Sequence, residues 1–273
     1  MKTDSQQNTL DREQVRQHFS AHAAEYNRYA QVQQRVVRRL VNLLAASSAN
    51  FQTGLEVGCG TGALSRIFYE NFPSSSLILS DLAHGMSLQS LNALPGSAVC
   101  DADASALPFM AQSFDFLISS SVYQWVERLP AAFQEAGRVL KSDGMFGLAL
   151  FGERTLHELR TSHQRALPEH QSHGQSFPTL EAVNLALQGR FDVEQLFSED
   201  ELEWHADVPD LLRGLKRIGA QNSSTRRPPG LASRRVMQAM FDHYRAEFGD
   251  TRGIPATYQV IYLLARKKPE LSW

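Results

Sequence analysis

Apolar side chains recur at two different spacings along the chain. In residues 11–46 they return every three or four positions, which predicts amphipathic helices. From Gly54 onward they gather into short runs, at 54–57, 76–81, 114–120 and 144–152. The stretches between these runs have helical spacing, at 62–72, 84–93 and 129–141. Short apolar strands that alternate with amphipathic helices predict a parallel sheet covered on both faces.

The C-terminal third of the chain has a less regular pattern. Residues 191–208 are typical of one or two strands, and residues 209–220 of a helix with Pro209 in its first turn. A loop rich in serine, proline and arginine follows at 222–230, and then another helix. Residues 257–267 are expected to form a final strand.

The exit of the first predicted strand is rich in glycine: Gly58-Cys59-Gly60-Thr61-Gly62. Glycine tolerates positive φ and lets a ligand touch the backbone, and the next helix offers free N–H groups at its N-terminus. A plain tight turn is the alternative. A dinucleotide fingerprint would place its last glycine one residue later, where Ala63 stands.

Acidic residues near this loop restrict the kinds of ligand that could bind there. Asp81 ends the second predicted strand, where a carboxylate can accept hydrogen bonds from a ribose diol. Asp103 and Ala104 lie in a third region, residues 101–109, where an adenine edge could be recognised, and Asp101 competes for that role. Glu56 suits a cationic ligand. Ribose, adenine and positive charge without a pyrophosphate describe S-adenosylmethionine.

Several segments together resemble the class I methyltransferase family: LEVGCGTG, the acid that ends the second strand, DASALPF, FDFLISSSVYQWV and RVLKSDG. The resemblance covers roughly residues 50–152. It implies a Rossmann-like α/β fold, with a seven-stranded, mostly parallel sheet, an antiparallel last strand and helices on both faces. It also implies S-adenosylmethionine as the cofactor, held by Glu56, Gly58, Cys59, Gly60, Thr61, Gly62, Asp81, Met86, Asp103, Ala104 and Ser119.

Two of these residues have a second interpretation. Cys59 is expected to fill space and not to act as a nucleophile, because methyl transfer needs no covalent intermediate with the enzyme. Met86 either packs on adenine or fills the core. With two cysteines in 273 residues, the chain suits a reducing compartment and offers no metal cluster.

The flanking segments resemble the malonyl-acyl carrier protein O-methyltransferases of biotin synthesis. Phe19, Ser20, Tyr26 and Gln33 fit that family, as do residues 215–220 and the TYQVIY ending. The resemblance implies methyl transfer to the free carboxylate of a malonyl thioester, bound to a carrier protein or to coenzyme A. A methyltransferase for a small free carboxylic acid and a methyltransferase-like assembly factor remain open.

The family resemblance suggests residues for the acceptor. Tyr26 is the catalytic candidate, to orient the reacting groups or close the pocket, although it could be a core aromatic. Six further residues are expected to bind the substrate: Gln33, Gln124, Trp125, Arg154, Arg226 and Arg227. No metal is expected.

Positive charge is concentrated in one segment of the chain. The whole chain has 27 basic and 29 acidic residues and a net charge of −2, which disfavours nucleic acid as a partner. Residues 213–235 nevertheless hold seven basic side chains, which would attract a strongly acidic acyl carrier protein. A solvated basic helix face is the alternative.

These patterns predict four parts of the chain. Residues 1–50 form an N-terminal helical lid, 51–208 the S-adenosylmethionine-binding core, 209–256 a helical basic lobe for substrate or partner, and 257–273 the final strand and tail. The N-terminus has no apolar segment typical of a signal peptide, and no apolar run is long enough to span a membrane. A cytoplasmic protein is therefore expected.

Overall fold

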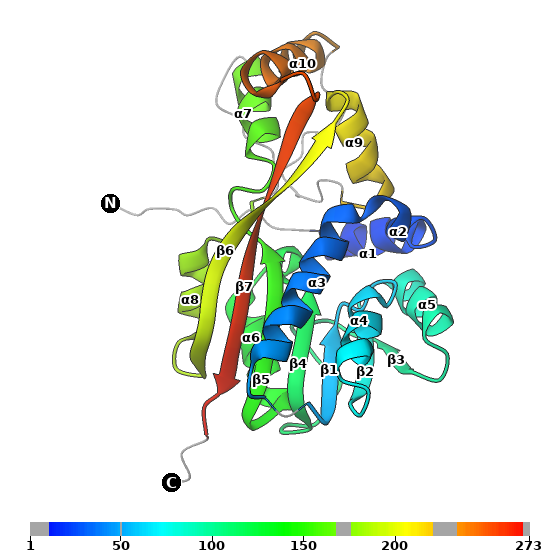
Figure 1. Ribbon diagram of the computed structural model, residues 1–273, viewed down its shortest axis with the longest axis vertical. Coiled ribbons are helices and arrows are strands. Elements are labelled where there is room, and N and C mark those ends of the chain that lie inside the picture. Colours follow the sequence, from blue (N-terminus) through cyan, green and yellow to red (C-terminus); the bar gives the residue numbers. More distant parts are fainter. Residues whose placement is uncertain (1–10, 50, 168–175, 221–233, 270–273) are drawn as a thin grey trace.

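Seven strands form one sheet in the computed structural model, which describes residues 11–49, 51–167, 176–220 and 234–269 (Figure 1). The strands are β1 (Thr53–Val57), β2 (Ser76–Asp81), β3 (Ala98–Asp101), β4 (Phe114–Ser120), β5 (Leu140–Phe151), β6 (Phe191–His205) and β7 (Ile254–Lys267). Their order is β3-β2-β1-β4-β5-β7-β6. β7 runs antiparallel to both neighbours, whereas the other pairs are parallel. The expected mostly parallel sheet with an antiparallel last strand is confirmed.

Helices cover both faces of this sheet. They are α1 (Arg12–His22), α2 (Tyr26–Tyr29), α3 (Gln31–Ala46), α4 (Ala63–Asn71), α5 (His84–Ala93), α6 (Leu129–Val139), α7 (His157–Ala166), α8 (Leu180–Leu187), α9 (Val208–Arg217) and α10 (Arg234–Phe248), with a 3₁₀ turn, η1, at Tyr123–Trp125. The apolar faces of α3 and α4 join one core cluster, and those of α6 and α8 join a second. Within the described ranges, no helix is long and apolar enough to cross a membrane.

The central strand β4 shows how the two cores are separated. Successive side chains of a strand point to opposite faces. Phe116 and Ile118 therefore lie in the α3–α4 core, whereas Leu117 between them lies in the α6–α8 core. A strand buried on both faces has no polar alternation, and this explains the continuous apolar run that the sequence shows there.

The sequence pattern located most of these elements. The helix expected at 84–93 has those bounds in the structure, and the segment expected as one or two strands forms a single long strand, β6 (Phe191–His205), paired along its length with β7. Three elements had no sequence prediction: β3, α7 and α8. β3 has only four residues and no fully buried side chain, so it leaves no apolar run to detect.

β6 and β7 continue beyond the rest of the sheet as a two-stranded ribbon (Figure 1). β5 pairs with β7 only from Val260 to Arg266, whereas β6 accompanies β7 down to Ile254. α7, α9 and α10 pack around the free part of the ribbon. The Tyr244 hydroxyl of α10 donates to the carbonyl of Pro255 in β7 (2.7 Å). The ribbon thus carries a helical lobe above the carboxyl ends of the parallel strands.

An aromatic cluster fixes the start of β1 against α4. Phe116 stacks on Phe68, with ring centroids 5.2 Å apart, and its edge meets Phe51 at 5.1 Å. Gly54 makes this packing possible, because a Cβ atom there would lie 2.2 Å from the Phe116 ring. The cluster sets where β1 begins, and hence where its glycine-rich exit lies.

We expect Phe116→Ala to lower the free energy of unfolding by about 3–5 kcal/mol, because it leaves a cavity in a fully buried cluster. Urea titration followed by far-UV circular dichroism measures this change. Met110→Ala is the matched control: Met110 is 82% exposed, so its loss should change stability by no more than about 0.5 kcal/mol. Equal effects of the two substitutions would contradict the described core.

Candidate functional site

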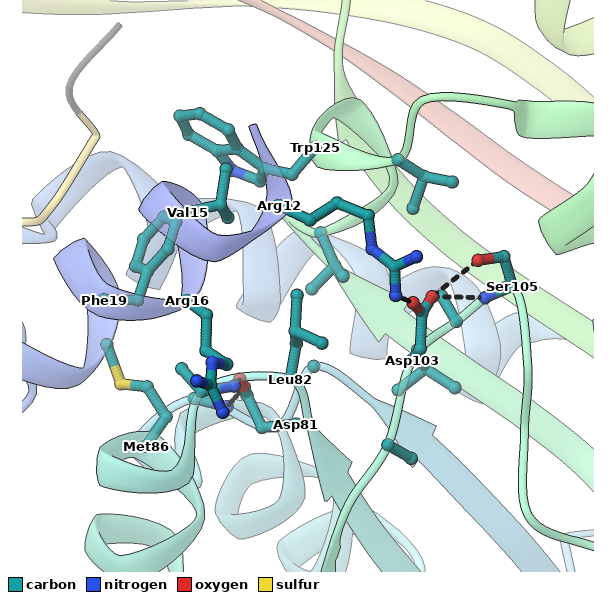
Figure 2. Close-up of a pocket in the computed structure, with 18 of the residues that line it drawn as sticks. Arg12, Val15, Arg16, Phe19, Asp81, Leu82, Met86, Asp103, Ser105 and Trp125 are labelled. Atoms are coloured by element: carbon teal, nitrogen blue, oxygen red, sulfur yellow. Dashed lines mark hydrogen bonds and ion pairs between the residues drawn. The ribbon is translucent and has the colours of Figure 1, made fainter. Parts of the chain in front are cut away.

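A cavity of about 370 Å³ lies at the carboxyl ends of β1, β2 and β4. Ligands of doubly wound sheets bind at this edge, where the strand order reverses. α1 forms the roof of the cavity. Figure 2 shows Arg12 and Phe19 of this helix across the cavity from Asp81 and Met86.

The glycine loop after β1 closes the cavity floor with its backbone. Gly58, Gly60 and Gly62 have φ of +73°, +54° and +80°, which disfavours residues with a Cβ. The N–H groups of Gly58 and Cys59 both donate to the carbonyl of Ser80 (2.7 and 2.9 Å). A Cβ at Gly60 would meet no atom within 4 Å. The open side of Gly60 therefore leaves bare backbone for a ligand.

Asp81 is the central acid of the cavity. One oxygen, Oδ2, accepts from the N–H of Gly60 (2.9 Å), and Oδ1 accepts from the N–H of Ala83 (2.8 Å). Burial raises the pKa of this carboxyl to about 6, despite these two hydrogen bonds. The orientation of Asp81 is thus fixed before any ligand arrives.

Glu56 lies under the glycine loop and is not among the residues that line the cavity. Its Oε2 accepts from the Ser65 hydroxyl of α4. Burial raises its pKa to about 8. Among the described residues, no lysine, arginine or histidine pairs with Glu56 or Asp81. Two buried acids without a counterion favour a cationic ligand nearby.

Asp103 and Ala104 line the other end of the cavity. Asp103 Oδ1 accepts from the N–H and the hydroxyl of Ser105 (2.8 and 2.6 Å), and its Oδ2 forms an ion pair with Arg12 of α1 (Figure 2). The competing acid, Asp101, does not line the cavity, because it bonds to His84 and Ser87 of α5. The geometry favours Asp103 over Asp101.

An aromatic wall completes the cavity. The ring of Phe19 meets Trp125 edge to face, with centroids 5.3 Å apart, and lies 6.4 Å from the ring of Tyr26. All three rings line the cavity, as does Met86. Burial raises the pKa of the Tyr26 hydroxyl above its usual range. Tyr26 therefore stays protonated at neutral pH and can donate a hydrogen bond, but it cannot serve as a base.

The chain is 42% identical over 266 residues to the malonyl-acyl carrier protein O-methyltransferase of Geobacter sulfurreducens. The aligned region covers 94% of this chain and 100% of that relative. The chain belongs to this methyltransferase family. The resemblance seen in the sequence is thereby confirmed, for the flanks as well as the core.

Three further comparisons are consistent with membership of the malonyl-acyl carrier protein O-methyltransferase family. The biotin biosynthesis bifunctional protein BioHC of Teredinibacter turnerae is 33% identical, over 91% of this chain and 46% of that protein. A family model described as a methyltransferase domain matches residues 55–148. The solved structure of the YcgJ protein from Bacillus subtilis superposes with a TM-score of 0.57 at 16% identity, covering 85% of this chain and 99% of that one, which shows the fold alone.

S-adenosylmethionine is the methyl donor in this family of methyltransferases. The cavity suits it in three respects: the bare backbone at Gly60, the fixed carboxylate of Asp81 and the uncompensated buried acids near a cationic sulfur. Within the described ranges, no three histidine, cysteine or acidic side chains gather as a metal would require.

Several residues expected to bind the cofactor lie behind the cavity wall, and their contacts with a ligand stay predictions. The hydroxyl of Ser119 donates to the carbonyl of Val57 (2.6 Å) and so ties β4 to β1. The thiol of Cys59 donates to Ser90 (3.3 Å), and burial raises its pKa, which fits a packing role. Gly62 starts α4 in a left-handed conformation. Thr61 donates to the side chain of Asn27 (2.5 Å).

The residues expected to bind the acceptor are more widely scattered than those expected to bind the cofactor. Trp125 lines the cavity, whereas Gln124 lies behind it and donates to the carbonyl of Ser121 (2.8 Å). Gln33 lies on α3, partly buried and outside the lining. Arg154 pairs with Asp200 of β6 (3.2 Å). The remaining two, Arg226 and Arg227, lie outside the described residues.

The sequence interpretation missed three arginines that line the cavity: Arg12, Arg16 and Arg128. A signal for the first two was available. Arg12, Arg16 and Phe19 are spaced by four and three residues, which places them on one face of a helix. Arg128 precedes α6, and no spacing in the sequence marks it, because only the tertiary fold brings it to the cavity.

We expect cofactor affinity to fall below pH 6, about tenfold per pH unit well below the pKa of Asp81. Ionised Asp81 is expected to accept hydrogen bonds from a ribose diol, and with a raised pKa of about 6 it is half protonated at that pH, which removes an acceptor. Calorimetric titration with S-adenosylhomocysteine between pH 5 and 8 measures this dependence.

Asp81→Asn is the control for that titration. It should weaken binding at pH 7.5 by about a hundredfold, since the negative charge and one of the two acceptor oxygens are lost. Its affinity should also no longer change near pH 6. A variant that keeps the same pH profile would show that another group titrates.

Proposed function

We propose that this enzyme transfers a methyl group from S-adenosylmethionine to the free carboxylate of a malonyl thioester, as a step of biotin synthesis. The observation that carries the proposal is the 42% identity over the whole length of a relative named for that reaction. The similarity therefore includes the roof helix and the C-terminal lobe, where acceptor specificity is expected, and not the cofactor core alone.

The chemistry places few demands on acid–base catalysis. When bound, S-adenosylmethionine would supply a methyl group activated by its positively charged sulfur; the carbon–sulfur bond would break as the carboxylate oxygen bonds to the methyl carbon, leaving neutral S-adenosylhomocysteine. A carboxyl group is ionised at neutral pH, so the protein needs no general base. Tyr26, protonated and facing the cavity, is proposed to donate a hydrogen bond that orients the reacting groups.

The main contribution of the protein is orientation and exclusion of water. Fixing two reactants in a reactive geometry can contribute about 7–11 kcal/mol. The glycine loop, Asp81 and Asp103 are proposed to hold the cofactor. Phe19 and Trp125 meet above them and exclude water, which strengthens the attraction between unlike charges in the cavity.

The acceptor carboxylate needs a cationic partner. Arg154 remains a candidate, but it would have to leave Asp200. We add Arg128 as a candidate: it lines the cavity and has no acidic partner among the described residues. An arginine can hold a carboxylate through two parallel hydrogen bonds.

The carrier protein is proposed to dock on the basic face of α9 and the start of α10. Arg213, Lys216 and Arg217 of α9 are exposed, as are Arg234 and Arg235 of α10. The apolar face of α9 is turned inward, with Leu211 fully buried. A basic face on this lobe would attract a strongly acidic partner.

We expect methyl-labelled S-adenosylmethionine to label malonyl-acyl carrier protein in a single turnover, giving a base-labile ester. Malonyl-coenzyme A should react more slowly, because it lacks the acidic carrier surface, and free malonate least of all. Label on none of the three, with cofactor still bound, would overturn the proposal. Label on malonate alone would indicate a methyltransferase for small acids.

We expect the double variant Arg213→Glu, Lys216→Glu to raise the KM for malonyl-acyl carrier protein about tenfold, since each reversal turns attraction into repulsion. The KM for malonyl-coenzyme A should change less than twofold. Arg38→Glu, an exposed arginine on α3, is the matched control and should leave both values unchanged. Equal effects on both thioesters would exclude this face as the carrier site.

A further inference from the structure

The C-terminus of α9 ends in a turn that requires glycine. The N–H of Gly219 donates to the carbonyl of Lys216, and the N–H of Ala220 donates to the carbonyl of Leu215, both at 3.1 Å. These two hydrogen bonds form a Schellman motif, whose first residue after the helix cap is left-handed. Gly219 has a φ of +72° accordingly. The motif fixes where the chain leaves α9.

Gly219 lies against the backbone of the roof helix α1. A Cβ atom at Gly219 would lie 3.0 Å from the carbonyl oxygen of His18 and 3.3 Å from the Cα of Phe19. Backbone atoms cannot turn aside as the end of a long side chain can, so α1 itself would have to move. Beside this contact, the guanidinium of Arg217 lies over the ring of Tyr29, 4.6 Å from its centroid.

A second glycine holds the same segment from α5. The N–H of Gly85 donates to the hydroxyl of Ser20 (3.3 Å), and a Cβ at Gly85 would lie 2.7 Å from the carbonyl oxygen of Ser20. Residues 18–20 therefore contact two glycines from separate parts of the fold. Phe19, between them, turns its ring toward Trp125 in the cavity (Figure 2).

We propose that Gly219 is a positioning residue of the cofactor cavity and acts through the backbone of His18 and Phe19. Because Gly219 lies in the turn that ends α9, the C-terminal lobe sets the distance between α1 and the bound cofactor. The affinity for cofactor then depends on a residue that does not line the cavity. This inference does not rest on the identity of the acceptor.

The test compares two substitutions at Gly219 by calorimetric titration with S-adenosylhomocysteine. Gly219→Ala adds a Cβ at a positive φ, and Gly219→Asn adds a Cβ with a side chain that tolerates this conformation. Both should raise the dissociation constant about tenfold, since a small displacement of the roof disturbs a fixed binding geometry. No acceptor is present, so failure of the malonyl reaction would not affect this result.

Gly189→Ala is the matched control. Gly189 has a φ of +80°, and a Cβ there would meet no atom within 4 Å. The control should share the backbone strain and lose stability as Gly219→Ala does, but keep its affinity within twofold. Wild-type affinity in Gly219→Asn would attribute the effect to strain and overturn the proposal, as would equal loss of affinity in the control.

Tyr29→Leu tests the neighbouring contact between the lobe and the N-terminal helices, that of Arg217 with Tyr29 of α2, without adding volume, in case the Gly219 variants do not fold. It removes the ring under Arg217 and should weaken S-adenosylhomocysteine binding about threefold. Unchanged affinity in a folded Tyr29→Leu protein would overturn the proposal that the lobe positions the roof.

Discussion

The hydrogen bond between the Asp81 carboxylate and the N–H of Gly60 is the constraint on which the site depends. It joins the exits of two neighbouring parallel strands, β1 and β2, whose register already places Val57 beside Ser80. The glycine loop can adopt its course because Ser80 receives two further N–H groups from it. Keeping this acid buried is costly, as its raised pKa shows, and a cationic ligand would offset that cost.

The cavity is assembled from regions that are distant in sequence. Its floor comes from the loops after β1, β2 and β3, its wall from η1, and its roof from α1. The hydrogen bond from Thr61 to Asn27 ties α2, which follows the roof helix in the chain, to the glycine loop, and the turn after α9 contacts the roof helix at Gly219. The cofactor core, the N-terminal helices and the C-terminal lobe thus form one functional unit.

The local part of this site could be predicted from the sequence, and the tertiary part could not. Glycine spacing and an acid at a strand end mark the floor, because both follow from backbone geometry within a few residues. Glu56 and Val57 are adjacent in sequence, yet strand alternation leaves only Val57 on the cavity. Arg128 reaches the cavity through packing of distant elements, which no local pattern reports. Likewise β3 was missed because its position depends on pairing with β2.

The position of β7 has a consequence for biosynthesis. This strand follows all the others in sequence, yet it lies between β5 and β6 in the sheet. During translation on a ribosome, β5 would present an unpaired edge and β6 would lack its partner until β7 emerges. Unpaired strand edges promote aggregation, and pairing over long sequence separations slows folding. A nascent chain that stalls before Ile254 would therefore be a natural substrate for chaperones and proteases.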